Sequence, residues 1–113
     1  MHEYSITGSI IEILEDIARK NKLDRIKKVN FLLSPTASIE PESVRFYYRY
    51  LAGDSRLLSG AKLVFEKSMI RMRCNLCGKE SGIKEFKPLC PGCGSSDVVM
   101  DRPEEIKIIS VET

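Results

Sequence analysis

The four cysteines of this chain occur as two Cys-x-x-Cys pairs, and this spacing constrains the fold more than any other feature of the sequence. The pairs are Cys74 with Cys77 and Cys90 with Cys93, twelve residues apart, and each pair is followed by a glycine. Two cysteines three positions apart can direct both sulfurs to one side of a tight turn, so two such turns supply four thiolates at tetrahedral geometry. The spacing therefore predicts a zinc-ribbon-like module in which all four cysteines bind a structural zinc ion.

Two other uses of four cysteines stay open from the sequence alone. Four thiolates also hold iron–sulfur clusters, and paired cysteines form disulfides in oxidising compartments. Disulfides are not expected, because the chain has no expected secretory signal: acidic residues such as Glu3 and Glu12 interrupt its N-terminal apolar segment. We therefore expect a cytoplasmic protein without a membrane span. Zinc remains the favoured metal, with an iron–sulfur cluster as the open alternative. A closed shell of four sulfurs leaves no ligand position for a substrate, so the zinc is expected to be structural.

The remaining sequence predicts two helices and three strands. Apolar residues recur at helical spacing across residues 4–20, and Pro41 and Gly53 suit the two ends of a second helix. Strands are expected over residues 25–33, 62–73 and 105–112, and in the first of them Val29, Phe31 and Leu33 alternate and so share one face. The pattern predicts an α+β fold, in which two helices cover a three-stranded sheet and the cysteine module is inserted before the last strand.

These elements also predict two domains. Residues 1–73 and 98–113 would form an α/β domain, and residues 74–97 would form the zinc-binding, zinc-ribbon-like domain. A segment as short as the second has too small a core to fold alone, so we expect its metal to supply much of its folding energy.

The charge of the chain gives little support for nucleic-acid binding. The 113 residues include 18 basic and 16 acidic side chains, for a formal net charge of +2. A nucleic-acid interface needs a clear local excess of positive charge. A basic cluster does occur between Arg19 and Lys28, but it also suits the end of a helix followed by a solvated strand. A zinc-ribbon module that binds nucleic acid is therefore kept as the alternative function.

The only histidine of the chain, His2, directly follows Met1. The terminal amine, the His2 amide nitrogen and the His2 imidazole can form adjacent chelate rings, a nitrogen-rich and nearly planar set that suits Ni(II) or Cu(II). The amide or carboxylate of Glu3 is close enough to add a ligand. The spacing of residues offers no serine–histidine–aspartate or cysteine–histidine arrangement and no glycine-rich phosphate loop. No catalytic residue is predicted, and we do not expect an enzyme.

Taken together, these motifs resemble the HypA family of nickel-insertion accessory proteins for [NiFe]-hydrogenase maturation. The resemblance rests on the start MHE followed by YSITGSIIEIL, on PESVRFYYRYL and SGAKLVFE in the middle, and on CNLC and CPGC. It covers the whole chain in order and length. One departure is the segment LLSPTAS, which lacks the glycine-containing turn common in the family.

The resemblance implies a nickel metallochaperone. Its nickel site would be His2 with the terminal amine of Met1, helped by Glu3, and its zinc ligands would be the four cysteines. It implies HypB, a GTPase, and the precursor of the hydrogenase large subunit as partners. In some bacteria the family also serves urease maturation through UreE. Neither a membrane nor a nucleic acid is expected as a partner.

Overall fold

The computed structural model describes the chain except for residues 1, 36, 84–86 and 102–103, and the side chain of His2 is likewise not described. In chain order the elements are α1 (His2–Asn21), β1 (Lys28–Leu33), α2 (Pro41–Leu51), β2 (Lys62–Lys67), β3 (Ile70–Cys74), β4 (Glu80–Ile83), β5 (Val98–Met100) and β6 (Ile106–Glu112). Within the described residues, no helix combines the length and the apolar character that a membrane crossing requires.

The chain divides into two compact units. The first comprises Met1–Phe31, Ile39–Phe65 and Ile108–Thr113, and the second comprises Leu32–Ser38 and Glu66–Lys107. The second unit thus contains all four cysteines together with the strands that flank them.

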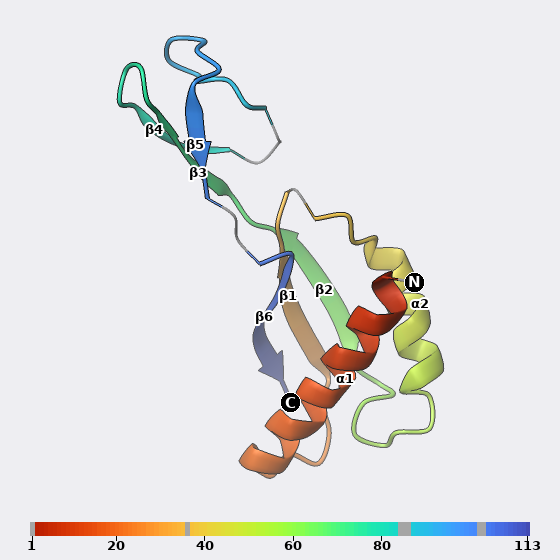
Figure 1. Cartoon of the computed structure of the whole chain (residues 1–113). Helices are drawn as coiled ribbons and strands as arrows, with labels where there is room; N and C mark the ends of the chain where they lie inside the picture. The colour runs from red at the N-terminus through yellow and green to blue at the C-terminus, as the bar shows by residue number, and fades with distance from the viewer. Residues whose placement is uncertain (1, 36, 84–86, 102–103) are drawn as a thin grey trace. The chain divides into compact units, whose positions relative to one another are not determined.

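A three-stranded sheet in the order β2-β1-β6 carries the two helices on one face (Figure 1). The N–H of Lys62 donates to the Lys27 carbonyl and that of Ser68 to the Leu33 carbonyl, so β1 and β2 advance together and are parallel. Helix α2 forms the crossover between them. The Lys27 N–H, just before β1, donates to the carbonyl of Glu112, the last residue of β6. Because the start of β1 thus pairs with the end of β6, the two strands are antiparallel.

The core of this fold lies between the central strand and the helices. Along β1, Val29, Phe31 and Leu33 are buried, and Phe31 stacks on Phe65 with ring centroids 4.8 Å apart. Helix α1 buries one stripe of residues at helical spacing, namely Thr7, Ile10, Leu14 and Ala18. The three β1 side chains that were expected to share one face are all buried. The predicted α+β fold is confirmed.

The prediction of one continuous strand over residues 62–73 is wrong. The chain forms β2 up to Lys67 and β3 from Ile70, and these strands belong to different sheets. At the break, the Ser68 N–H still donates to the Leu33 carbonyl, at 2.8 Å. In the sequence only three consecutive polar residues, Glu66, Lys67 and Ser68, stand at the break, without a glycine or proline that would mark the end of a strand.

The second sheet has the order β4-β3-β5 and is antiparallel throughout. Its central strand β3 alternates strictly: Ile70, Met72 and Cys74 are buried, whereas Arg71 and Arg73 are exposed. The strand therefore buries the first cysteine. Cys90 is also buried, whereas Cys77 and Cys93 are exposed.

Candidate metal centres

The sulfur atoms of the four cysteines form one cluster. All four lie within 4.8 Å of one another. The Sγ atoms of Cys74 and Cys93 are 3.6 Å apart, and those of Cys77 and Cys90 are also 3.6 Å apart, so both short contacts join one pair to the other. A tetrahedral zinc site with Zn–S bonds of about 2.3 Å has sulfur–sulfur edges of about 3.8 Å. The cluster therefore has the size and donor set of a four-cysteine zinc site.

A glycine after each pair permits the turn that brings the sulfurs together. Gly78 and Gly94 have φ angles of 75° and 77°, in the left-handed region that side chains other than glycine rarely adopt. In the first turn the Gly78 N–H donates to the Cys74 carbonyl, and in the second the Gly94 N–H donates to the Cys90 carbonyl, at 3.0 and 2.8 Å. The two turns are therefore built alike.

Backbone N–H groups point at the sulfurs inside these turns. The Cys77 N–H lies 3.4 Å from the Cys74 sulfur, and the Gly92 N–H lies 3.3 Å from the Cys90 sulfur. Such bonds stabilise the thiolate, which is the form that binds a metal. Accordingly, backbone N–H groups of Cys93 and Gly92 lower the pKa of Cys90 to about 6, and the N–H of Cys77 lowers the pKa of Cys74.

The pKa of Cys93 shifts in the opposite direction to those of Cys74 and Cys90. The Ser95 N–H lowers the pKa of Cys93, but desolvation and hydrogen bonds to the other three sulfurs outweigh it and raise that pKa to about 12. Four negative sulfurs within contact distance repel one another, so the cluster retains a proton unless a cation is bound. A divalent metal ion would supply the missing positive charge, and the donor set fits one.

Two further hydrogen bonds tie the first cysteine turn to the segment that follows the second. The Asn75 N–H donates to the Asp97 carbonyl at 2.9 Å, and the Asn75 side chain donates to the Asp97 carboxylate at 3.1 Å. Neither residue was predicted from the sequence, because a pairing across 22 positions leaves no periodic signal.

Two of the predicted nickel ligands, His2 and Glu3, are the first residues of α1. Met1 and the side chain of His2 lie outside the described residues. Glu3 is half-buried in the first turn of α1, and its carbonyl accepts a 2.6 Å hydrogen bond from the hydroxyl of the fully buried Thr7. Among the described residues, only the cysteines form a group of three or more His, Cys, Asp or Glu side chains near enough to share a metal ion.

A family model described as "Hydrogenase/urease nickel incorporation, metallochaperone, hypA" matches residues 1–113. The chain belongs to the HypA family. Two curated proteins, both called hydrogenase maturation factor HypA, are similar along nearly their whole length. The one from Moorella thermoacetica is 35% identical over 96% of this chain and 95% of its own. The one from Caldanaerobacter subterraneus subsp. tengcongensis is 34% identical over 99% of this chain and 98% of its own.

Two solved structures share the fold. The solution structure of the Ni metallochaperone HypA from Helicobacter pylori superposes with a TM-score of 0.69 at 21% identity, covering 97% of this chain and 95% of that one. A second HypA solution structure gives a TM-score of 0.70 at 22% identity, covering 99% and 95%. The family membership expected from the motifs is therefore confirmed, and so is the fold.

Proposed function

We propose that this member of the HypA family is a nickel metallochaperone that binds Ni(II) at its N-terminus and delivers it during [NiFe]-hydrogenase maturation. The family match carries the proposal, because it spans both the MHE start and the four cysteines and describes nickel incorporation. The curated relatives are named hydrogenase maturation factors. In this role the chain carries nickel as cargo and does not act as an enzyme.

The start of α1 supports nickel binding by backbone nitrogen. Because α1 begins at His2, the N–H groups of His2 and Glu3 lie in its first turn, where no intrahelical acceptor exists. The His2 amide can therefore exchange its proton for a metal without breaking a helical hydrogen bond. The positive end of the helix dipole disfavours a cation there, and the deprotonated amide and the Glu3 carboxylate would offset that cost. The proposed ligands are Met1, His2 and Glu3.

For the four cysteines we propose a structural zinc ion. The sulfur separations and the N–H groups directed at sulfur support this assignment. Bound zinc would cross-link the two turns and contribute folding energy to a module with few apolar residues. The proposed organisation assigns residues 1–73 and 98–113 to nickel binding and residues 74–97 to zinc binding. The proposed partners are a HypB-type GTPase and a hydrogenase large-subunit precursor, with UreE where urease is matured.

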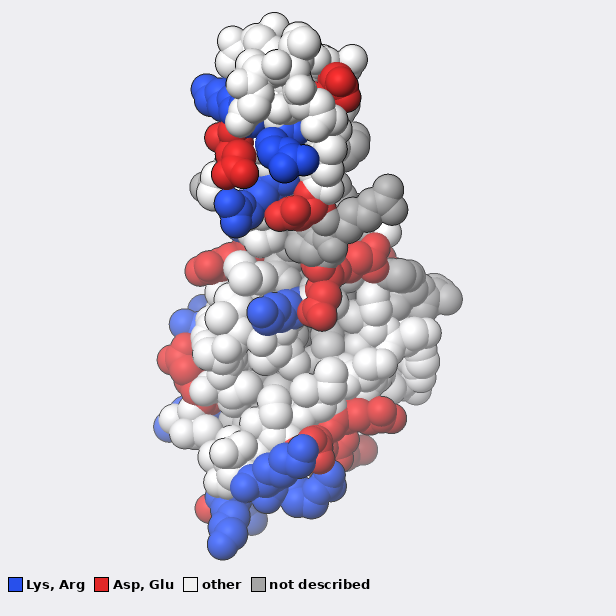
Figure 2. All heavy atoms as spheres, turned by 60° about the vertical axis from the view of Figure 1, so that its left-hand side comes forward, with Lys and Arg blue, Asp and Glu red and all other residues white. Residues whose placement is uncertain are grey.

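The distribution of charge does not favour the nucleic-acid alternative. On the face shown in Figure 2, Lys and Arg side chains gather at the lower end of the picture. Elsewhere on this face they are interspersed with Asp and Glu, so no basic surface extends along it. Binding to phosphates needs such a surface.

Calorimetric titration of the zinc-loaded protein with Ni(II) tests the nickel proposal. We expect binding that weakens at least about tenfold in His2→Ala, because the imidazole completes the chelate. Equal affinity of the two proteins would contradict the proposal. Zinc is tested separately by elemental analysis: we expect one zinc per chain, and its loss in Cys74→Ala. A fully folded wild-type protein without zinc would contradict the structural role.

A further inference from the structure

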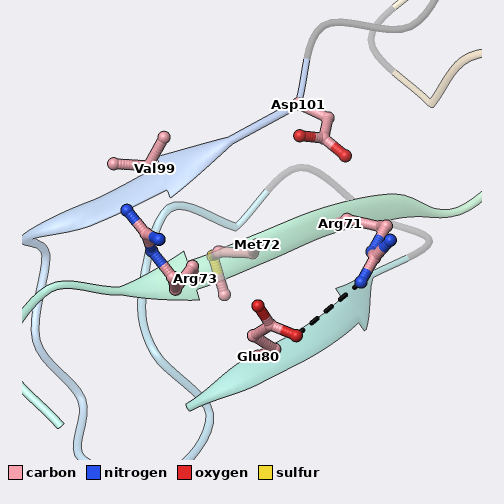
Figure 3. A pocket seen from close by; sticks show the side chains of 6 residues that line it. All are labelled: Arg71, Met72, Arg73, Glu80, Val99 and Asp101. Carbon is pink, nitrogen blue, oxygen red and sulfur yellow. Dashed lines mark ion pairs between the residues drawn. The ribbon is translucent and has the colours of Figure 1, made fainter. Parts of the chain in front are cut away.

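The second sheet has one exposed face, and two arginines occupy its centre. Arg71 and Arg73 are two residues apart on the central strand β3, so both project from the same face. The strand register places Glu80 of β4 and Val99 of β5 on either side of Arg73. The face encloses a shallow hollow of about 390 Å³ whose lining also includes Asp101 (Figure 3).

The two arginines differ in how they are paired. Arg71 forms an ion pair with Glu80 at 3.7 Å, and both side chains are well exposed, so the pair is weak. Figure 3 shows the Arg73 guanidinium directed toward Val99 and away from Glu80. The structure, over the residues it describes, gives Arg73 no ion pair. The centre of the face therefore presents one free guanidinium and one that is held loosely.

Apolar side chains flank the arginines on both sides. Val99 on β5 is 50% exposed, and Met69, just before β3, is 53% exposed. Met69 packs over Gly82 of β4, since a Cβ at Gly82 would lie 2.6 Å from the Met69 methyl carbon. Because Gly82 lies opposite Arg71, the Met69 side chain covers the β4 side of this face. The two arginine side chains thus lie between the half-exposed apolar side chains of Val99 and Met69.

We propose that this face binds an extended acidic segment of a partner protein, with alternate carboxylates on Arg73 and Arg71. In an extended chain, side chains at positions i and i+2 lie on one side about 6.7 Å apart, which is also the spacing of two residues along β3. Arginine binds a carboxylate through two parallel hydrogen bonds, a geometry that lysine does not offer. The methylene groups of the acidic side chains would contact Val99 and Met69.

The acidic residues of the face restrict where such a segment can lie. Glu80 on β4 and Asp101, which directly follows β5, border the arginines on opposite sides and repel carboxylates placed beyond them. The segment is therefore confined to the line of β3. Every residue in this inference belongs to the second unit, so the inference does not rest on nickel binding at the N-terminus.

NMR titration of the full, zinc-loaded protein tests the proposal, with acetyl-Gly-Glu-Leu-Glu-Leu-Glu-Gly-amide as the probe. We expect amide shifts confined to β3, β4 and β5. Arg73→Gln should weaken binding about fivefold, because it removes the free guanidinium. Glu80→Gln should strengthen binding, because it releases Arg71. The matched control is Arg56→Gln, an exposed arginine of the first unit, which should leave the affinity unchanged.

Several results would overturn the inference. These are equal affinity of Arg73→Gln and wild type, equal affinity for the same peptide with Gln in place of Glu, and shifts outside the second sheet. A retained, well-dispersed spectrum for Arg73→Gln shows that the variant folds, so a loss of binding is then local. A single-stranded DNA oligonucleotide that binds with the same Arg73 dependence, while the peptide does not, would assign the face to nucleic acid instead.

Discussion

The Asn75 side chain donates a hydrogen bond to the Asp97 carboxylate at 3.1 Å, alongside the 2.9 Å bond from the Asn75 N–H to the Asp97 carbonyl. Asn75 lies inside the first cysteine turn, and Asp97 immediately precedes β5. This pair therefore fixes the first turn to the strand that leaves the module. The backbone bond survives substitution of either side chain, whereas the side-chain bond does not.

Asn75→Ala should speed the transfer of zinc from the protein to a competing chelator. Loss of one exposed hydrogen bond costs about 1 kcal/mol, so the apparent zinc affinity should fall about fivefold. The matched control is Asn21→Ala, which removes an exposed bond from Asn21 to the Ile17 carbonyl in α1. Asp97→Ala should lower the apparent zinc affinity as much as Asn75→Ala does, and the double variant should lower it no further. Additive losses would show that the two side chains act separately.

Gly94→Ala should destabilise the zinc-bound module more than Gly92→Ala does. Gly94 has a φ of 77°, so alanine there is strained by about 1 kcal/mol whatever space surrounds it. A Cβ at Gly92 would lie 2.9 Å from Cδ of Lys79, a flexible side chain that can move away. Thermal unfolding of the two zinc-loaded variants measures the difference. A larger loss for Gly92→Ala would show that the Lys79 side chain is held firmly over this turn.

Local signals made most of this structure predictable from sequence. The cysteine spacing and the glycines after each pair indicated the turns, and the alternation of Val29, Phe31 and Leu33 indicated the buried face of β1. Pairings between distant segments carry no such signal. At the break between β2 and β3, Ser68 bonds to Leu33, 35 positions away, and the Asn75–Asp97 link joins positions 22 apart. Both depend on which strand lies beside which, and periodicity does not contain that information.

Tyr48 should make the stability of the first unit depend on alkaline pH. Its hydroxyl donates a buried 2.7 Å hydrogen bond to the Leu58 carbonyl, and burial raises the pKa of Tyr48 from 10.0 to about 12. Because the folded state holds this proton more tightly than the unfolded state, the stabilisation is complete below about pH 10. It is lost as the pH rises through about 12.

Denaturant unfolding of wild type and Tyr48→Phe across this pH range tests the prediction. The variant should be less stable at neutral pH by about 1 kcal/mol, and the difference should shrink above pH 10. Comparison with the variant is needed because lysines titrate in the same range. The control is Tyr50→Phe, since Tyr50 is 77% exposed and should leave the pH profile unchanged. A constant difference between Tyr48→Phe and wild type would exclude the proposed linkage.

The free amine should matter to nickel binding as much as the imidazole does, if Met1, His2 and Glu3 form the proposed chelate. A flexible extension of several residues ahead of Met1 keeps His2 and Glu3 but moves the amine out of the chelate ring. Nickel affinity in calorimetric titration should then fall about as far as in His2→Ala, at least about tenfold. The same extension placed after Thr113 should have no effect on nickel affinity, and zinc content should stay constant in all variants.

The protein with the N-terminal extension could instead bind nickel as wild type does while His2→Ala does not. In that case the amine is not a ligand, and the other nickel ligands must come from Glu3 and backbone nitrogen. If neither change matters, nickel binds elsewhere on the chain.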